Sequence, residues 1–420
     1  MGPRSRTWGG APGTGWVGPE LYVDVARSLE RACFDYLVFE DSLQVSDTYG
    51  GSRDYALRAA FSAPEHDPLP YLPVIADATS HIGLVGTVST SFYPPFLAAR
   101  LAVTLDHVTR GRAGINLVTS STHQAARNFG QDRHADHDDR YARADEWIRL
   151  VRALWESWEP DAVVPDRFAE VYADHTKVHR VDFEGRFFRS RGPLNTVPGP
   201  QYRPVVCQAG GSAAGRDLGA AHADTVIALV QGVEAMKAYR ADVRARAAAT
   251  GRDPDSVKVL FIVSPTFGDT DADAWQRRAA ADAAQAADPT FLLASMSYFS
   301  GIDFAAFDPD LPLPADLVTN GHQSTMADFF AAAADRPLRE AAGAYRLVES
   351  VRLVGTPDSV AAQMGEVMAE VGGDGFLVTG PVDRHYVAEV ADGLGPELAR
   401  RGLIRDGYTG TTLRDHLLEY

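Results

Sequence analysis

Residues 112–130 read RAGINLVTSSTHQAARNFG, an apolar run that ends in a cluster of hydroxyl side chains and continues into a helical pattern. An apolar run bounded by turn formers predicts a fully buried strand. The residues 119–122 are all Thr or Ser, and they follow at the point where such a strand would leave the core. The stretch therefore predicts a buried strand whose end presents hydrogen-bonding groups.

Six further β-rich apolar runs resemble this one. They lie at 34–41, 82–90, 204–212, 223–230, 257–269 and 375–381. Most are preceded by stretches with helical spacing, at 21–33, 95–108, 141–158, 235–250 and 359–371. Strands that alternate with amphipathic helices predict a parallel sheet covered by helices. We therefore expect an α/β fold, and within it a (β/α)8 barrel of the TIM type.

Two intervals are too long to be simple connections. Residues 122–203 would follow the fourth barrel strand and residues 270–374 the seventh, and both carry extra helical stretches, prolines and aromatic residues. In α/β barrels, insertions of this kind usually build the roof of the active site. No compositional break marks a linker, so we expect residues 1–420 to form one barrel domain with both insertion segments around the active site.

Seven strands are one fewer than an eight-stranded barrel needs. The missing first strand should precede the first helical stretch, but residues 1–19 are rich in Gly, Pro and Arg and contain no apolar run. Either the chain is shortened at its start or an irregular segment replaces this strand. The sequence leaves both alternatives open.

The charge balance limits the possible partners. The chain has 40 Lys and Arg against 56 Asp and Glu, a net charge of −16, which opposes non-specific binding to nucleic acid or to anionic membranes. No apolar stretch reaches the ~20 residues that span a bilayer, and the start lacks the apolar segment of a secretory signal. Cys33 and Cys207 lie far apart in apolar stretches, so no disulfide is expected. We expect a cytoplasmic protein without nucleic-acid or membrane partners.

A glycine-rich loop follows the apolar run that begins at 204. Gly210, Gly211 and Ser212 lead directly into a helical pattern. Free amides at a helix start, glycines that allow close approach and a serine hydroxyl are typical of an anion site, and a phosphate group fits there. The alternative is an ordinary capped helix after a glycine turn.

The segment HADHDDRYARADEW begins at His134. His137 and Tyr141 are four residues apart, so on a helix they would share one face and could hold one ligand together. The alternative is a solvated helix start, the usual explanation of such a charged run. A catalytic zinc ion needs three protein ligands, and since no third ligand is evident, no metal is expected.

Two further residues lie on predicted strands. Asp41 ends the strand at 34–41, where a carboxylate serves either as a turn cap or as a ligand contact at the barrel mouth. Thr87 lies within the strand at 82–90, where a β-branched residue is ordinary. Neither residue indicates a site on its own.

Taken together, eight stretches resemble the bacterial-luciferase-like flavin monooxygenases. They are FEDSLQVSDTYG, GTVSTSFYPPF, LDHVTRGRAGINLVTSS, ARNFG, HDDRYARADEW, VDFEGRFFRSRGPLN, QAGGSAAGR and GYTGTTLRDHLLEY. Within that family they are most similar to the branch of dibenzothiophene-sulfone, nitrilotriacetate and EDTA monooxygenases and the pristinamycin synthase large subunit. The stretches occur in order over roughly residues 20–420, which makes them far more specific together than any one alone.

This resemblance implies a (β/α)8 barrel that uses reduced FMN and O2 to oxygenate a small organic substrate. It also implies a separate NAD(P)H-dependent flavin reductase as partner, and a homodimer or homotetramer. The expected FMN contacts are Asp41, Thr87, His137, Tyr141, Gly211 and Ser212, with Asn116 and Ser120 as weaker candidates. Gly211, Ser212 and Tyr141 would lie near the phosphate and ribityl chain, and Asp41 and Thr87 nearer the flavin ring.

The substrate is less defined than the cofactor. Residues 289–307 bring together five aromatic side chains, at Phe291, Tyr298, Phe299, Phe304 and Phe307. We expect a lid here, with Phe291, Tyr298 and Phe299 in the substrate pocket; the alternative is the core of an inserted helical layer. Relatives tend to carry His at the position of Phe299, so no catalytic acid or base is assigned. The expected substrate is a small organic molecule, which could be aromatic or contain sulfur or nitrogen. A deazaflavin-dependent barrel and a non-catalytic flavin binder are the competing hypotheses.

Overall fold

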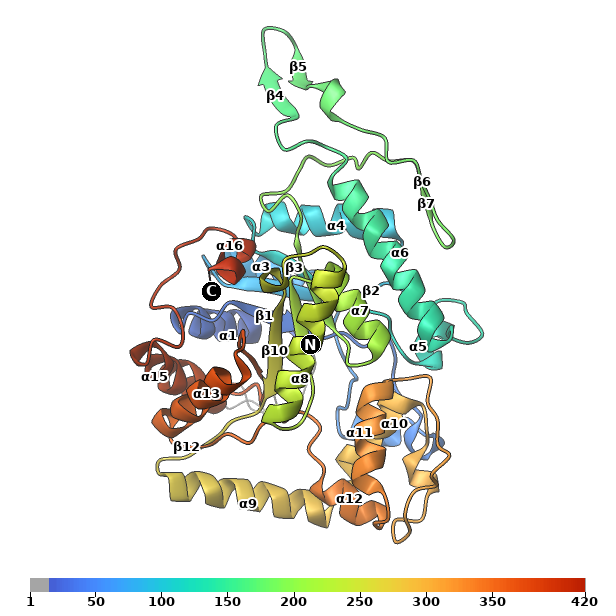
Figure 1. The fold of residues 1–420 in the computed structure, drawn as a ribbon, viewed down its shortest axis with the longest axis vertical. Helices are drawn as coiled ribbons and strands as arrows, with labels where there is room; N and C mark the ends of the chain where they lie inside the picture. The colour runs from blue at the N-terminus through green and yellow to red at the C-terminus, as the bar shows by residue number, and fades with distance from the viewer. Residues whose placement is uncertain (1–14, 420) are drawn as a thin grey trace.

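A seven-stranded parallel sheet forms the centre of the molecule (Figure 1). The structure is a computed structural model, and it describes residues 15–419. The strands run in the order β1-β2-β3-β8-β9-β10-β13, and every neighbouring pair is parallel. Their bounds are Tyr36–Phe39, Gly83–Ser89, Ala113–Val118, Val205–Ala209, Thr225–Ala228, Lys258–Val263 and Phe376–Val378. Each strand lies within one of the seven predicted runs, which confirms the predicted parallel α/β sheet.

Helices follow most strands and cover the sheet, as the alternating pattern predicts. The main ones are α1 (Glu20–Arg31), α3 (Tyr71–Asp77), α4 (Pro95–Val108), α6 (His137–Trp155), α7 (Ala213–His222), α8 (Val233–Ala249) and α13 (Pro357–Val371). Every residue of β2 is buried, and one large apolar cluster joins the strands to α1, α3, α4, α6 and α8. Burial on both faces explains why these strands read as continuous apolar runs rather than as alternating patterns.

The two outer strands of the sheet are β1 and β13, and each pairs on one side only among the described residues. An eighth strand would have to lie between them to close a barrel. Of the segment in which that first strand was expected, residues 1–14 lie outside the described residues, and residues 15–19 form turns and bends. The closed eight-stranded barrel therefore stays a prediction.

The first long interval carries α5 (His123–Asn128), all of α6 and two short hairpins. One hairpin, β4 (Val163–Asp166) with β5 (Val171–Ala173), projects as an arm beyond α6 (Figure 1). The other, β6 (Phe183–Glu184) with β7 (Arg189–Ser190), is held to α6 by the buried carboxylate of Glu146. That carboxylate accepts the backbone N–H groups of residues 186, 187 and 188 at 2.9, 2.8 and 2.7 Å.

The second long interval forms a helical group of its own. It contains α9 (Asp271–Ala287), α10 (Thr290–Ser300), α11 (Gln323–Ala333) and α12 (Leu338–Ala344), which lie together at the end of the molecule away from the β4–β5 arm (Figure 1). A separate apolar cluster holds α10, α11 and α12 together, and Phe304 is only 1% exposed within it. Phe304 is therefore part of the core of this inserted layer. The grouping of both intervals with the barrel in one domain stays a prediction.

Short elements complete the chain. They are α2 (Asp54–Arg58), β11 (Thr266–Phe267), β12 (Val354–Gly355), α14 (Arg384–Ala388), α15 (Gly395–Arg400) and α16 (Leu413–Leu418). Both cysteines are free: Cys207 is buried in β8, and Cys33 is half-buried. Within residues 15–419, none of the helices combines the length and the apolar character needed to cross a membrane.

Arg112, the first residue of the stretch 112–130, joins three elements at the amino-terminal end of the sheet. Its side chain is 2% exposed. Its Nη2 donates to the carbonyls of Ala76 and Thr79 at 2.6 and 3.1 Å, just at and beyond the end of α3. Its Nη1 donates to Thr79 Oγ1 at 2.9 Å, and its Nε to the Thr109 carbonyl at 3.0 Å after α4. One guanidinium thus fixes α3 and α4 relative to β3.

Arg112→Met should lower the free energy of unfolding by about 3–5 kcal/mol, because it keeps the apolar stem but leaves several buried carbonyls without a donor. Urea denaturation of the purified variant measures this. Arg110→Met, two residues earlier and exposed, is the matched control and should change stability by less than about 0.5 kcal/mol. Equal effects of the two substitutions would contradict the anchoring role of Arg112.

Candidate active site

The carboxyl ends of parallel strands meet at one edge of the sheet, where active sites of such folds lie. Thr87 and Asn116 stand opposite each other on the paired strands β2 and β3. Asp41 and Ser120 each follow a strand by two residues, after β1 and β3 respectively. The glycine loop follows β8, which pairs directly with β3. The fold therefore gathers at this edge most of the residues that the sequence singled out.

A line of polar contacts connects the ends of β1, β2 and β3. The Thr87 hydroxyl donates to the Phe39 carbonyl at 2.7 Å and accepts from Asn116 Nδ2 at 3.0 Å. Asn116 Oδ1 is buried, and it has no hydrogen-bond partner among the described residues. Because buried acceptors are almost always paired in native proteins, this oxygen is available to a donor group of a ligand.

Ser120 occupies a less usual conformation beside this line. Its φ is +52°, in the left-handed region that few side chains other than glycine adopt at no cost. The Ser120 hydroxyl lies 2.8 Å from the Ser89 hydroxyl, so the turn after β3 is tied to the end of β2. The conformation turns the chain at the rim of the sheet, and backbone strain of this kind clusters at ligand sites.

The glycine loop starts α7 as predicted. Ser212 is the N-cap residue, and its hydroxyl accepts the Gly215 amide at 3.1 Å. A Cβ atom at Gly211 would lie 2.5 Å from Ser324 Oγ, and one at Gly210 would lie 2.4 Å from Gln208 Nε2. The loop therefore has no room for side chains and presents backbone amides at a helix start, a geometry that suits a phosphate group.

His137 and Tyr141 share one face of α6, as their spacing predicts. Their rings lie 4.8 Å apart. His137 is only 7% exposed, so a solvated helix start does not describe it, although Asp138 beside it is exposed. Burial raises the pKa of the Tyr141 hydroxyl, while hydrogen bonds to Ser212 and Thr119 and the charge of Arg140 act in the opposite direction. Tyr141 thus lies between the end of β3 and the glycine loop.

The second long interval covers this face of α6, through residues that the sequence did not single out. Asn320 Oδ1 accepts the backbone N–H of His137 at 2.7 Å, and the Asn320 carbonyl accepts Arg140 Nη2 at the same distance. Ser324 lies against Gly211. The segment GHQS around these residues has no pattern typical of a site, since its role depends on contacts across more than 180 residues.

The aromatic residues of α10 face two different neighbours. The ring centroids of Tyr298 and Phe61 lie 5.5 Å apart. The Tyr298 hydroxyl lies 2.9 Å from Oγ of Ser42, the residue that follows Asp41. Phe299 packs on the ring of His322 at 4.7 Å. Phe291 also contacts Phe61, but half of its surface is exposed. Tyr298 therefore reaches the site through Ser42, and Phe291 lies at its margin.

His322 places an imidazole beside the ring of Phe299. Burial and, to a smaller extent, the charges of Arg140 and His137 lower the pKa of His322 to about 4. Its imidazole is therefore neutral near pH 7.

Asp41 places a carboxyl group at this edge of the sheet. Burial and, to a smaller extent, the nearby carboxylates of Glu65 and Asp67 raise the pKa of Asp41 to about 7. Near neutral pH this carboxyl exchanges between a form that donates a hydrogen bond and one that only accepts. Perturbed acids of this kind are concentrated at functional sites.

Fold and site together define a luciferase-like oxidoreductase. Residues 4–402 match the family described as luciferase-like monooxygenase. The chain belongs to this family, and it is a flavin-dependent monooxygenase. The predicted family is confirmed, and so is the predicted role as the oxygenase of a flavin-dependent monooxygenase.

Particular relatives cover nearly the whole chain. Dibenzothiophene-sulfone monooxygenase of Rhodococcus erythropolis is 36% identical, over 95% of this chain and 89% of its own. Nitrilotriacetate monooxygenase component A of Aminobacter aminovorans is also 36% identical, over 95% and 89%. The solved structure of riboflavin lyase, with modified FMN and riboflavin, superposes with a TM-score of 0.87 at 32% identity, over 96% and 89%. The sheet is thus the curled parallel sheet of the luciferase-like, TIM-barrel type.

The raised pKa of Asp41 predicts a particular pH dependence of stability. Between the ordinary value of 3.8 and about 7 the folded chain keeps a proton at Asp41 that the unfolded chain releases, so stability should fall as pH rises through this window and level off above it. Asp41→Asn should flatten that decline. Urea midpoints from pH 5.5 to 8 measure it, and the exposed Asp77→Asn should keep the wild-type slope. An unchanged slope in Asp41→Asn would sink the assignment.

Proposed function

We propose that this chain receives reduced FMN from a separate NAD(P)H-dependent flavin reductase and uses it with O2 to oxygenate a small organic substrate. The observation that carries the proposal is the arrangement of two polar groups at one edge of the sheet. One group suits a phosphate: the glycine loop, Ser212 and Tyr141. The other, at the ends of β1 to β3, has a buried acceptor that no described residue pairs with, and an acid whose pKa is raised to about 7.

The residues present fit FMN as the cofactor. The amides of Gly211 and Ser212 at the start of α7 would hold its phosphate, with Tyr141 beside them. Asn116 Oδ1 has no partner in the part of the chain that the structure describes, so it suits an N–H group of a flavin ring, and Thr87 fixes the orientation of that amide. When bound, reduced FMN supplies the electrons that activate O2.

The protein itself would orient the cofactor and exclude water. Asp41 would hold or release a proton beside the ring, because its pKa lies near neutral pH. Asn320 and Ser324 bring the second long interval against α6 and the glycine loop, so that this interval closes the cofactor side of the site. Excluding water strengthens every polar contact inside such a site and protects reactive species from side reactions.

The substrate side is defined by aromatic rings and one neutral imidazole. Tyr298 and Phe299 would form an apolar wall, with Phe291 at its outer margin. His322, neutral at pH 7, can donate or accept one hydrogen bond to a polar atom of the substrate. We therefore propose a small substrate with an apolar body and one polar group, in keeping with relatives named for a sulfone and for an aminocarboxylate.

A substrate screen tests this proposal directly. Sulfones, sulfides, aromatic compounds and tertiary amines would be incubated with the chain, reduced FMN and O2, with oxygen uptake and mass spectrometry as readouts. The expected result is a product heavier by one oxygen atom, dependent on reduced FMN. Turnover with a reduced deazaflavin in place of FMN, without incorporated oxygen, would contradict it.

Supply by a reductase also bears on where the chain works and how it is assembled. A cytoplasmic location would give it access to NAD(P)H-reduced flavin, and a homodimer or homotetramer is proposed as its assembly.

Because flavin passes between two proteins, the purified chain should be nearly colourless and should bind reduced FMN more tightly than oxidised FMN. Purification with stoichiometric, non-exchanging flavin would contradict this supply route.

FMN should bind much more tightly than riboflavin, since only FMN carries the phosphate that the glycine loop would hold. Ser212→Ala removes one hydroxyl and should weaken FMN binding by about 1–2 kcal/mol, while leaving riboflavin binding unchanged. Anaerobic titration of reduced flavin, followed by fluorescence, measures both. Equal affinities for the two flavins would show that the loop holds no phosphate.

His137→Ala and Tyr141→Phe should each weaken binding of reduced FMN by about 1–3 kcal/mol, the usual effect of a lost polar contact. The fold should stay intact, because each side chain lies at the site edge of α6. The exposed Asp139→Asn, whose carboxylate pairs with Arg186 and not with His137, is the matched control on the same helical turn and should leave the affinity unchanged. Unchanged flavin affinity in both site variants, with normal melting temperatures, would remove His137 and Tyr141 from the cofactor site.

A further inference from the structure

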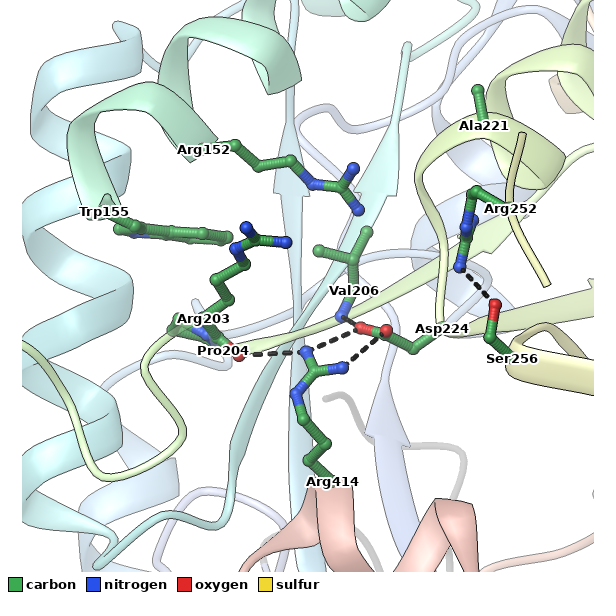
Figure 2. A pocket seen from close by; sticks show the side chains of 10 residues that line it. All are labelled: Arg152, Trp155, Arg203, Pro204, Val206, Ala221, Asp224, Arg252, Ser256 and Arg414. Carbon is green, nitrogen blue, oxygen red and sulfur yellow. Dashed lines mark hydrogen bonds and ion pairs between the residues drawn. The ribbon is translucent and has the colours of Figure 1, made fainter. Parts of the chain in front are cut away.

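A second polar recess lies at the opposite end of the sheet. Figure 2 shows four arginines, from four different segments, around the amino-terminal ends of β8 and β9. The cavity measures about 310 Å³. Its lining consists of Arg152, Trp155, Arg203, Pro204, Val206, Ala221, Asp224, Arg252, Ser256 and Arg414. Since β8 and β9 run from this recess toward the flavin edge, the recess is separate from the site proposed for FMN.

Two of the four arginines are neutralised by carboxylates. Arg414 Nη1 and Nη2 lie 2.8 and 3.1 Å from the two oxygens of Asp224. Arg203 pairs with Glu156 at 2.7 Å. Asp224 also accepts the Val206 amide at 2.8 Å, so that both of its oxygens are engaged. Within residues 15–419, the direct ion pairs of Asp224 and Glu156 are therefore with Arg414 and Arg203.

The other two arginines, Arg152 and Arg252, form no ion pair within residues 15–419. Arg152 donates to the ring and the carbonyl of His222, and Arg252 to Ser256 and to the carbonyls of Ala220 and Ala223. Burial lowers the pKa of Arg152 to about 10, against the attraction of Asp224, and repulsion from Arg252 and Arg203 contributes. Burial also lowers the pKa of Arg252. Two desolvated positive charges thus share one recess.

These contacts also cap the carboxyl end of α7, and a capping role would explain each arginine by itself. It does not explain the cavity between them. A guanidinium has five N–H donors; Arg152 uses two of them and Arg252 three in these contacts within the described chain. Unused donors, unpaired charge and open volume occur together here, in a chain whose net charge is −16.

We propose that this recess binds a phosphate group, as inorganic phosphate or as the phosphate of a small metabolite. Guanidinium groups match the oxygens of phosphate with paired N–H donors, and Ser256 holds Arg252 in place by accepting from its Nη2 at 3.3 Å. The cavity holds about ten times the ~30 Å³ of one water molecule, which leaves room for a phosphate with a short organic group. The walls formed by Trp155, Pro204 and Val206 would contact that group.

The test is calorimetric titration of the full chain with inorganic phosphate, in chloride buffer at constant ionic strength. Saturable binding is expected, and Arg152→Gln and Arg252→Gln should each weaken it by about tenfold or more. Arg180→Gln, at an exposed ion pair with Asp182, is the matched control and should leave it unchanged. Heat that chloride alone reproduces, or equal affinity in all three variants, would overturn the proposal.

Since Arg152 and Arg252 also cap α7, a variant that keeps both arginines is needed. Ala221→Glu would place a carboxylate on the wall of the recess, where it should compete with phosphate, abolish saturable binding and raise the melting temperature in phosphate-free buffer. Unaltered phosphate binding in Ala221→Glu would overturn the assignment.

Two further arms identify the site and the source of the phosphate. Ser212→Ala alters the glycine loop and should leave phosphate binding in the recess unchanged; loss of binding in Ser212→Ala alone would place the phosphate at the loop and overturn the proposal.

Glycerol 3-phosphate is titrated beside inorganic phosphate. Tighter binding of the ester supports a metabolite as ligand, and equal or weaker binding supports free phosphate.

Discussion

Parallel pairing of the seven strands is the constraint on which the rest of the structure depends. In a parallel sheet all strands begin at one edge and end at the other, so every connection must return along the outside, usually as a helix. The turns after β1, β3 and β8 therefore converge, although they lie far apart in the chain. The same constraint collects the segments before β8, β9 and β10 at the opposite edge, where Arg152 and Arg252 meet.

Polar groups are arranged differently at the two edges of the sheet. At the amino-terminal edge, carbonyls at the ends of helices are covered by guanidinium groups: Arg112 serves α3, and Arg252 serves α7. At the carboxyl edge, short hydroxyl and amide side chains are tied to one another, and Asn116 Oδ1 keeps no partner within residues 15–419. The first arrangement stabilises helix ends, whereas the second leaves bonding capacity for a ligand.

Much of this architecture could be read in advance from local pattern. All seven strands of the sheet were predicted, and so were the helices α1, α4, α6, α8 and α13, because apolar runs and helical spacing are local properties of the chain. Helix α3 was not predicted. The start of α7 at Ser212 and the shared face of His137 and Tyr141 follow from capping and from helical periodicity in the same way. Asp41, Thr87 and the other expected flavin contacts came instead from family resemblance, since neither Asp41 nor Thr87 is distinctive by itself.

The sequence by itself therefore determined the fold class, the family and the capped glycine loop at Ser212, because each is encoded in short segments. Only the tertiary structure decided that Phe304 belongs to a helical core while Phe299 meets an imidazole, that Asn320 holds the start of α6, and that Asp41 titrates near neutral pH. These properties depend on burial and on contacts between residues far apart in the chain. Long-range packing and desolvation leave no periodic trace in a sequence, and for that reason the arginine recess became visible only in the folded chain.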